Sequence, residues 1–305
     1  DGILFALSFE MLTPVNVFNF RELARESLLA KHHISYHYSL YMIGEYPRPV
    51  TEDNYIAFVP GFTEEDKQNY LKAVHDSIEL DRHYLSLLSQ PHTLQVAKKI
   101  KNRLGGKTYV NNASTLQSFR ERAAGHKIIH IGTHAEFNNL LPERSRLIFS
   151  KDPHSTLDSN SLFLSDIYNC SIRSDLTILT ACESGKPGFR DGEGMVSMAH
   201  AFNYAGSQSI LTGLWKIDEK ASSFITERFV RHIENHLPAA TALRQAKLES
   251  LEPADGRTLA PAYWAGLVLI GQTPELDLAP SVNHISWLFI SGGLLLAILV
   301  FYFQK

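Results

Sequence analysis

Apolar residues in this chain form short continuous runs that alternate with segments of helical character. The short runs are rich in β-branched and aromatic residues, which is typical of strands buried in a sheet. They occupy residues 55–61, 127–131, 176–180, 208–215 and 264–270. Segments with the spacing or the end signals of helices lie between the strands. They occupy residues 63–88, 94–104, 114–124 and 239–251. This alternation predicts an α/β fold.

Two of the predicted strands lead into residues that can carry chemistry. The run 176–180 is followed by Ala181 and Cys182, and the run 127–131 is followed closely by His134. In an open parallel sheet the carboxyl ends of the strands open onto one crevice. We therefore expect Cys182 and His134 to lie close together at this edge of the sheet.

A cysteine and a histidine in this arrangement can act as a nucleophile and its base. A thiolate attacks a carbonyl carbon far better than a thiol, and an imidazole can take the thiol proton and later give it to the leaving amine. The histidine precedes the cysteine by 48 residues (182 − 134), close to the roughly 50 residues that separate the two in caspases. Small neighbours would let a substrate backbone approach. They are Gly132, Ala135, Ala181 and Gly185.

Motifs along most of the chain resemble, in the same order, those of the CHAT family, a caspase-like peptidase domain related to separases and caspases. The matching segments are residues 129–135, 179–185, 192–195, 201–206, 213–218, 242–246 and 263–271. The resemblance implies a caspase-like domain over residues 1–272, with a mostly parallel sheet flanked by helices. It also implies a cysteine endopeptidase that hydrolyses protein substrates in signalling or defence, with a helical-repeat or regulatory region preceding the chain.

The same resemblance assigns roles to individual residues. Cys182 is the nucleophile and His134 the general acid and base, and the backbone N–H groups of Cys182 and Ala135 hold the oxyanion. Many relatives have glycine where Ala135 stands, and alanine would be strained there if the position needed a positive φ. The pattern fixes no third member, and Glu136 and Glu183 are candidates for orienting the histidine.

Asp218 has two roles open to it. It comes just before a segment expected to be helical, and aspartate is favoured as a helix N-cap because its carboxylate accepts hydrogen bonds from the first free N–H groups. The stretch 214–218 also resembles a separase segment whose acidic residue receives an arginine. That resemblance implies that Asp218 binds substrate in a pocket selecting a basic residue before the scissile bond.

The remaining cysteine, histidines and glycines suggest no further chemistry. Nothing around Cys170 resembles a nucleophile site. The glycine-rich stretch 185–194 lacks the Gly-Lys-Ser/Thr ending of a phosphate-binding loop. Five histidines in the amino-terminal part lack the spacing of a zinc site. They are His32, His33, His37, His75 and His83. We therefore expect neither a metal nor a cofactor.

Composition and charge bear on the class of partner. A chain of 305 residues with 44% hydrophobic content can bury a large core. Its 29 basic and 32 acidic residues give a net charge of −3, whereas nucleic-acid binders usually show a marked basic excess. The expected partner is a protein substrate, and no nucleic acid is expected.

The carboxyl-terminal residues differ in character from the rest. Residues 273–284 have the prolines and acidic residues of a linker. The next 19 residues, 285–303 (303 − 285 + 1), carry no charge, and as a helix they would span roughly 28 Å, close to a bilayer core of about 30 Å. Trp287 and Tyr302 lie near the two ends, as interfacial aromatics do. The sequence thus predicts a single-pass membrane helix with the catalytic domain in the cytoplasm. The alternative function is a non-catalytic caspase-like scaffold that binds a signalling partner at the membrane.

Overall fold

A six-stranded sheet forms the centre of the protein. The computed structural model describes residues 27–38, 51, 53–74, 80–138, 140–151, 159–180, 188–190, 194–253 and 256–278. The strands are β1 (Asp53–Val59), β2 (Lys107–Val110), β3 (His126–Ile131), β7 (Ser174–Leu179), β10 (Ser207–Gly213) and β11 (Leu267–Gly271). Their order is β11-β10-β7-β3-β1-β2, and neighbours are parallel except for the antiparallel pair of β10 and β11. The predicted α/β fold with a mostly parallel sheet is confirmed.

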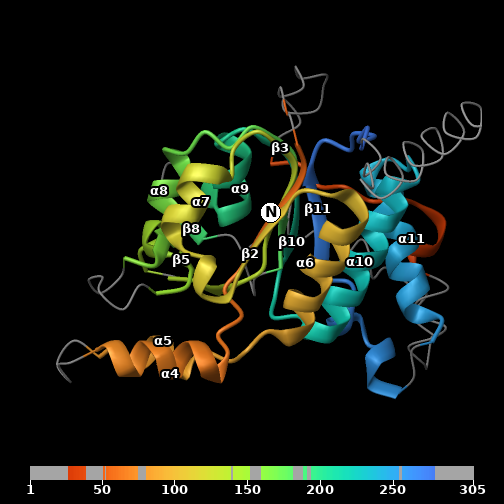
Figure 1. The fold of residues 1–305 in the computed structure, drawn as a ribbon. Coiled ribbons are helices and arrows are strands. Elements are labelled where there is room, and N and C mark those ends of the chain that lie inside the picture. Colours follow the sequence, from red (N-terminus) through yellow and green to blue (C-terminus); the bar gives the residue numbers. More distant parts are fainter. Residues whose placement is uncertain are drawn as a thin grey trace, which may run out of the picture.

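Helices cover both faces of this sheet (Figure 1). One face carries α6 (Pro91–Leu104), α10 (Glu219–Glu234) and α11 (Ala239–Leu251), and the other carries α7 (Leu116–Arg122), α8 (Leu164–Tyr168) and α9 (Met198–Tyr204). Side chains along a strand alternate between the two faces. In β1, Tyr55, Ala57 and Val59 therefore enter the core on the α6 side, while Ile56 and Phe58 enter the core on the α7 side. Burial on both faces explains why the strands are continuous apolar runs in the sequence.

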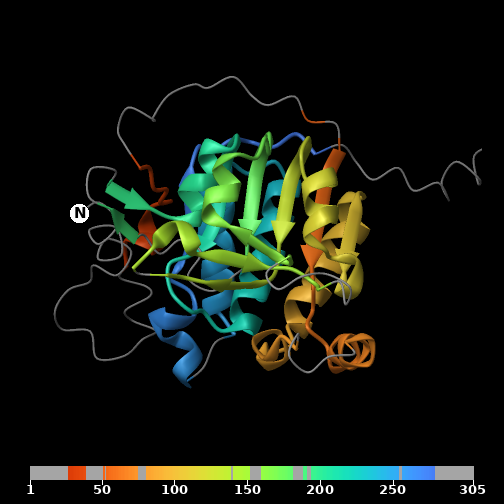
Figure 2. The same ribbon diagram turned by 90° about the vertical axis from the view of Figure 1, so that its left-hand side faces the viewer.

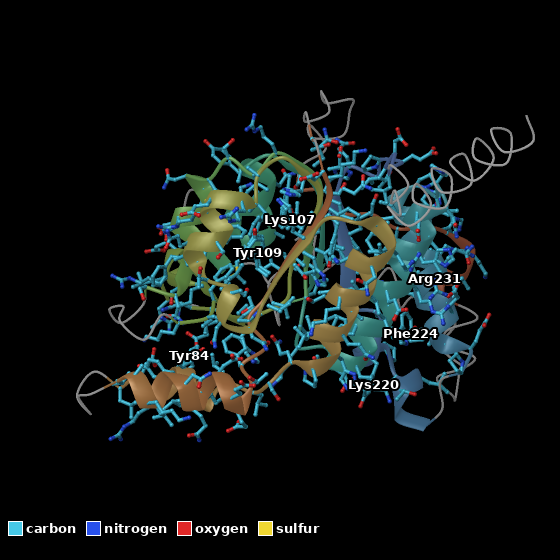
Figure 3. All side chains as sticks on the ribbon, in the orientation of Figure 1. Tyr84, Lys107, Tyr109, Lys220, Phe224 and Arg231 are labelled. Carbon is cyan, nitrogen blue, oxygen red and sulfur yellow. The ribbon has the colours of Figure 1, made fainter. Side chains whose placement is uncertain are left out.

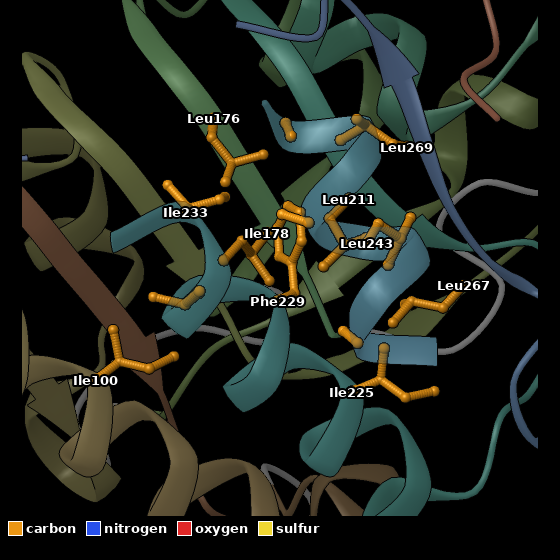
Figure 4. Packing of buried hydrophobic residues seen from close by; sticks show 14 of the residues in the cluster. Ile100, Leu176, Ile178, Leu211, Ile225, Phe229, Ile233, Leu243, Leu267 and Leu269 are labelled. Atoms are coloured by element: carbon orange, nitrogen blue, oxygen red, sulfur yellow. The ribbon is translucent and has the colours of Figure 1, made fainter. Parts of the chain in front are cut away.

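Helix α10 packs an apolar stripe against the middle of the sheet (Figure 4). Ile225, Phe229 and Ile233 recur every four residues and are fully buried, in one cluster with Ile178 of β7 and Leu211 of β10. Burying side chains of this size stabilises a fold by about 1.5–3 kcal/mol each. The helix is therefore firmly placed, and its first residues lie just past the carboxyl end of β10.

Shorter elements surround the main sheet. Strands β4 (His134–Glu136), β5 (Arg146–Ile148) and β6 (Ser161–Phe163) form an antiparallel sheet, and β8 (Gly188–Arg190) pairs with β9 (Gly194–Val196). The other short elements are helix α3 (Leu28–Lys31) and the 3-10 turns η2 (Asn111–Ala113), η3 (Pro142–Arg144), η4 (Gly256–Leu259) and η5 (Pro261–Tyr263). The three-stranded sheet matters most here, because it begins with His134.

Two short helices, α4 (Glu64–Ala73) and α5 (Arg82–Ser86), project from the edge toward which the central strands point (Figure 2). We call them the helical arm. A capping box starts α4, since Thr63 Oγ1 accepts from the Asp66 N–H at 3.2 Å and the Asp66 carboxylate accepts from the Thr63 N–H at 3.1 Å. The predicted single helical segment is instead two helices. Tyr84 of α5 (Figure 3) is buried against Phe62 and so packs the arm onto the body of the protein.

The carboxyl-terminal segment lies only partly within the described residues. In the predicted linker, residues 273–278 contain no helix or strand, and Leu276 and Leu278 are buried in the same core as α11. The predicted membrane helix at 285–303 falls outside the described residues. Within the part of the chain that the structure describes, no helix has both the length and the apolar character needed to cross a bilayer.

Candidate active site

The carboxyl ends of β3 and β7 lie next to each other in the middle of the sheet. Ile131 of β3 is paired with Leu179 of β7, and the Thr180 N–H donates to the Ile131 carbonyl at 3.1 Å. The loops that follow the two strands therefore start side by side. His134 opens β4 just after β3, whereas Cys182 and Glu183 fall outside the described residues.

His134 is held on two sides. Its Nε2 lies 2.7 Å from the main-chain oxygen of Leu88, and its ring packs against Phe62 with 5.1 Å between ring centroids. A carbonyl can only accept a hydrogen bond, so we assign the hydrogen to Nε2, which leaves Nδ1 with the free lone pair in the neutral ring.

Burial is the main cause that lowers the pKa of His134 below its ordinary value of 6.5. The positive charge of Lys216 lowers it further, while the Leu88 carbonyl and the carboxylates of Glu219 and Glu136 act in the opposite direction. A lowered pKa keeps the imidazole neutral at pH 7, which is the form that a general base requires.

The segment that follows the helical arm positions the Leu88 carbonyl. The Gln90 N–H donates to the Gly61 carbonyl at 3.1 Å, and the Gln90 side-chain amide donates to the Thr133 carbonyl at 3.5 Å. Phe62 has a φ of +50°, a left-handed conformation that is rare for a bulky residue and often found at functional sites. The two groups that contact the His134 ring, Phe62 and the Leu88 carbonyl, thus come from the segments just before and just after the helical arm.

The two residues that follow His134 on β4 are Ala135 and Glu136, and the Glu136 side chain contacts other residues. The Glu136 carboxylate accepts from Arg146 Nε at 2.7 Å and contacts His83 Nε2, so the contact that orients His134 comes from Leu88 and not from Glu136. A main-chain carbonyl leaves no signature in a sequence, and this partner could not be found there. Ala135 belongs to an extended strand, where alanine fits without the strain of a positive φ.

A pocket opens at the same edge of the sheet, on the α6 and α10 face. Its lining consists of Gln90, Leu179, Thr180, Gly213, Trp215, Ile217, Glu219, Ser222 and Leu267. Glu219 supplies the carboxylate, and one of its oxygens accepts from the Thr93 N–H at 2.9 Å. The indole of Trp215 donates to the Ala262 carbonyl at 3.0 Å. A Cβ at Gly266 would come within 2.3 Å of this indole, so the glycine makes room for the pocket wall.

Asp218 lies beside the pocket but caps a helix. It is the N-cap of α10, and its Oδ1 accepts from the Ala221 N–H at 2.9 Å. Its side chain is exposed, and the lining carboxylate belongs to the next residue, Glu219. At this turn the residue that lines the pocket is therefore Glu219, the neighbour of Asp218.

Other candidate groups show structural contacts. Cys170 donates to the Asp166 carbonyl at 3.4 Å, and burial raises the pKa of its thiol, so the thiol stays protonated and unreactive. His83 pairs with Glu136, and His75 falls outside the described residues. Over the described ranges, no three His, Cys, Asp or Glu side chains gather in a way that could hold a metal ion.

The sequence matches one family model and parts of two larger proteins. The family model for the CHAT domain matches residues 1–272. Tetratricopeptide repeat protein 28 of Mus musculus is 28% identical over 117 residues, which is 38% of this chain and 5% of that protein. Its Homo sapiens counterpart is 33% identical over 86 residues, 28% of this chain and 3% of that protein. The chain thus spans about one-twentieth or less of the length of these relatives.

Solved structures with a similar course of the chain include cysteine peptidases. The Saccharomyces cerevisiae separase–securin complex aligns with a TM-score of 0.45 and 13% identity, covering 75% of this chain and 13% of that chain. The Arg-specific cysteine proteinase gingipain R aligns with a TM-score of 0.45 and 10% identity, covering 76% of this chain and 50% of that chain.

Proposed function

This chain belongs to the CHAT domain family, and on that premise we propose that it is a cysteine endopeptidase with a dyad of Cys182 and His134. The observation that supports the proposal most directly is the state of His134. Its Nε2–H is engaged by the Leu88 carbonyl at 2.7 Å, and burial lowers its pKa, so Nδ1 is available as a base. Cys182 follows Thr180 by two residues, and chain connectivity keeps the two Cα atoms within about 7.6 Å.

The proposed reaction proceeds through an acyl-enzyme. His134 Nδ1 takes the proton from Cys182 Sγ, and the thiolate adds to the carbonyl carbon of the scissile peptide bond. The backbone N–H groups of Cys182 and Ala135 hold the resulting oxyanion. Collapse breaks the C–N bond while His134 protonates the leaving amine. His134 then deprotonates a water that hydrolyses the thioester, which releases the acid and restores the thiol. The Leu88 carbonyl stabilises the imidazolium in both halves.

We further propose that the pocket selects a basic residue before the scissile bond. Glu219 brings a negative charge to the lining, and the Thr93 N–H holds its carboxylate in place at 2.9 Å. Trp215 offers an aromatic wall against which a guanidinium or ammonium can pack. Asp218 adds a second negative charge at the same turn, although its carboxylate caps α10. We therefore assign the main charge recognition to Glu219.

Cleavage of reporter peptides tests the proposal. Peptides with a single arginine, lysine, glutamine or leucine should be offered to the parent chain and to Cys182→Ala. We expect cleavage after arginine or lysine by the parent alone, and covalent labelling of Cys182 by a peptide acyloxymethyl ketone. Equal signals from both chains would remove the peptidase proposal. Saturable binding of a peptide without turnover would favour the non-catalytic scaffold.

Two parts of the proposal concern residues beyond the domain. We propose that residues 285–303 anchor the chain in a membrane through the linker 273–284, with the domain in the cytoplasm. We also propose that a helical-repeat region precedes the domain, because the curated relatives are named for tetratricopeptide repeats, which are stacked pairs of helices. Carbonate-resistant membrane association that disappears on deleting 285–303 is the expected result for the anchor. Release of the intact chain by carbonate would contradict it.

A further inference from the structure

A second histidine lies behind the pocket wall. His130 is on β3, four residues before His134, and it is fully buried. Its Nδ1 is 2.9 Å from the Tyr55 hydroxyl and its Nε2 is 2.9 Å from Thr180 Oγ1. Burial lowers the pKa of His130 to about 4, so the ring is neutral at pH 7 and carries a single N–H.

The direction of these two hydrogen bonds follows from Tyr55. Its hydroxyl is fully buried, and among the described residues His130 is its only partner. If the hydroxyl accepted from Nδ1–H, its own hydrogen would be buried without an acceptor, which costs about 1–3 kcal/mol. Tyr55 therefore donates to Nδ1. The single hydrogen of the ring is then on Nε2 and is donated to Thr180 Oγ1.

Thr180 is consequently left with a hydrogen to donate. Its oxygen accepts from His130, and none of the described residues accepts the hydroxyl hydrogen. Thr180 lines the pocket and is only partly buried. Its N–H is bonded to Ile131 of β3, so main chain and side chain are both tied to the same strand. The hydroxyl is therefore fixed as a donor at the pocket.

Gln90 gives an independent sign that the pocket receives a polar ligand. Its side chain is only 6% exposed and lines the pocket, yet its Oε1 finds no hydrogen-bond partner among the described residues. A buried amide oxygen without a partner is costly in a folded protein. A bound peptide would offer N–H groups to such an acceptor and carbonyl oxygens to the Thr180 hydroxyl.

We propose that Thr180 is a substrate-binding residue that donates its hydroxyl hydrogen to a carbonyl oxygen of the bound peptide, and that His130 and Tyr55 are positioning residues that fix the direction of this donor. The inference rests on the proposed function only in that the pocket binds a peptide. It does not require the peptide to be cut. His130 acts through Thr180 and touches no substrate atom.

Peptide binding to the Cys182→Ala chain tests the donor without any chemistry. The probe is a fluorescein-labelled octapeptide with one central arginine, and the readout is fluorescence anisotropy. Replacing Thr180 by valine keeps the shape but removes the hydroxyl, so the dissociation constant should rise by about three- to tenfold, the usual worth of one hydrogen bond. The matched control Thr180→Ser keeps the hydroxyl and should stay within twofold of the parent.

Variants of His130 test whether it acts through Thr180. His130→Leu should weaken binding as much as Thr180→Val, and the double variant should lose no more than either single one. His130→Gln can keep an N–H near the position of Nε2 and should recover most of the affinity. If His130→Leu does not fold, His130→Gln and Tyr55→Phe complete the same cycle. Three outcomes would each overturn the inference. They are equal affinity of the Cys182→Ala chain with and without Thr180→Val, additive losses in the double variant, and no saturable binding by the Cys182→Ala chain.

The tautomer of His130 provides a test that needs no variant. Two-bond ¹H–¹⁵N correlation spectra of the parent chain at pH 7 should show the hydrogen on Nε2, and a hydrogen on Nδ1 would overturn the assigned direction. The outcomes stay separate from those of the peptidase proposal. Binding that depends on Thr180 without cleavage by the parent would leave this inference standing and remove the peptidase.

Discussion

The end of β3 and the start of α10 are two regions of the same sheet edge, and each carries two nearby side chains of the same kind. In the first region, His130 uses both ring nitrogens inside the fold, while His134 bonds to the described residues through Nε2 alone. In the second, Asp218 uses its carboxylate in a helix cap, while Glu219 lines the pocket.

The two regions differ in which member the sequence motif identifies. Near β3 the motif singles out His134, the residue with an available nitrogen. Near α10 it singles out Asp218, the residue that the fold employs. At α10 both carboxylates accept one backbone N–H, from Ala221 for Asp218 and from Thr93 for Glu219. What separates them is position, since Glu219 lines the pocket and Asp218 is exposed.

The largest expected effect comes from His134. We expect His134→Ala to lower turnover of the arginine reporter by about 10²- to 10⁴-fold, the usual contribution of a general acid and base. The thermal midpoint should change little, because the ring is only partly buried. His83→Ala is the matched control, since this histidine pairs with Glu136 and should retain activity. Steady-state kinetics with active-site titration measures both, and full activity in His134→Ala would contradict the assignment.

His130 should instead control the pH dependence of stability. The unfolded chain takes up a proton at this histidine near pH 6.5, but the folded chain resists until about pH 4. The unfolded state therefore binds more protons in this window, and the free energy of unfolding should fall as the pH drops from 6.5 to 4. The contribution of His130 is on the order of 3 kcal/mol.

Urea unfolding at several pH values measures how much His130 contributes to the pH dependence of the free energy of unfolding. In His130→Gln the decline between pH 6.5 and 4 should be shallower than in the parent, because the titrating group is gone. His37, His134 and His200 also have lowered pKa values, so a residual decline is expected in both chains. Parallel curves for the parent and the variant would show that His130 titrates alike in both states.

A smaller effect is expected at Glu219. Glu219→Gln removes the charge but keeps an oxygen for the Thr93 N–H, so the pocket should keep its shape. We expect kcat/KM for the arginine reporter to fall by about 10- to 100-fold, as expected for a charge-assisted hydrogen bond. Cleavage of a leucine reporter should not fall. If both reporters lose activity equally, the carboxylate supports the fold and not the selection of a basic residue.

The sequence predicts the sheet and the position of His134 because both depend on local signals. Strands such as β3 and β7 are rich in buried isoleucine and leucine, and parallel pairing brings their carboxyl ends together. The role of the Leu88 carbonyl was not predictable, because a main-chain group has no residue preference and the arm that delivers it departs from the expected single helix. The contact of His130 with Thr180 depends on strand register, which residue type alone does not reveal.

Residue type does not settle which of Asp218 and Glu219 receives the substrate, because adjacent residues at a helix start point in directions about 100° apart around the axis. The smallest expected effect tests this choice. Asp218→Ala loses the N-cap of α10 and should reduce the free energy of unfolding by about 1 kcal/mol, while Asp218→Asn keeps a capping oxygen and should stay near the parent. Neither variant should change the ratio of arginine to leucine cleavage, as measured with paired reporters. A fall of that ratio in Asp218→Asn at unchanged stability would return the pocket role to Asp218, and it would mean that an exposed carboxylate can serve the cap and the substrate together.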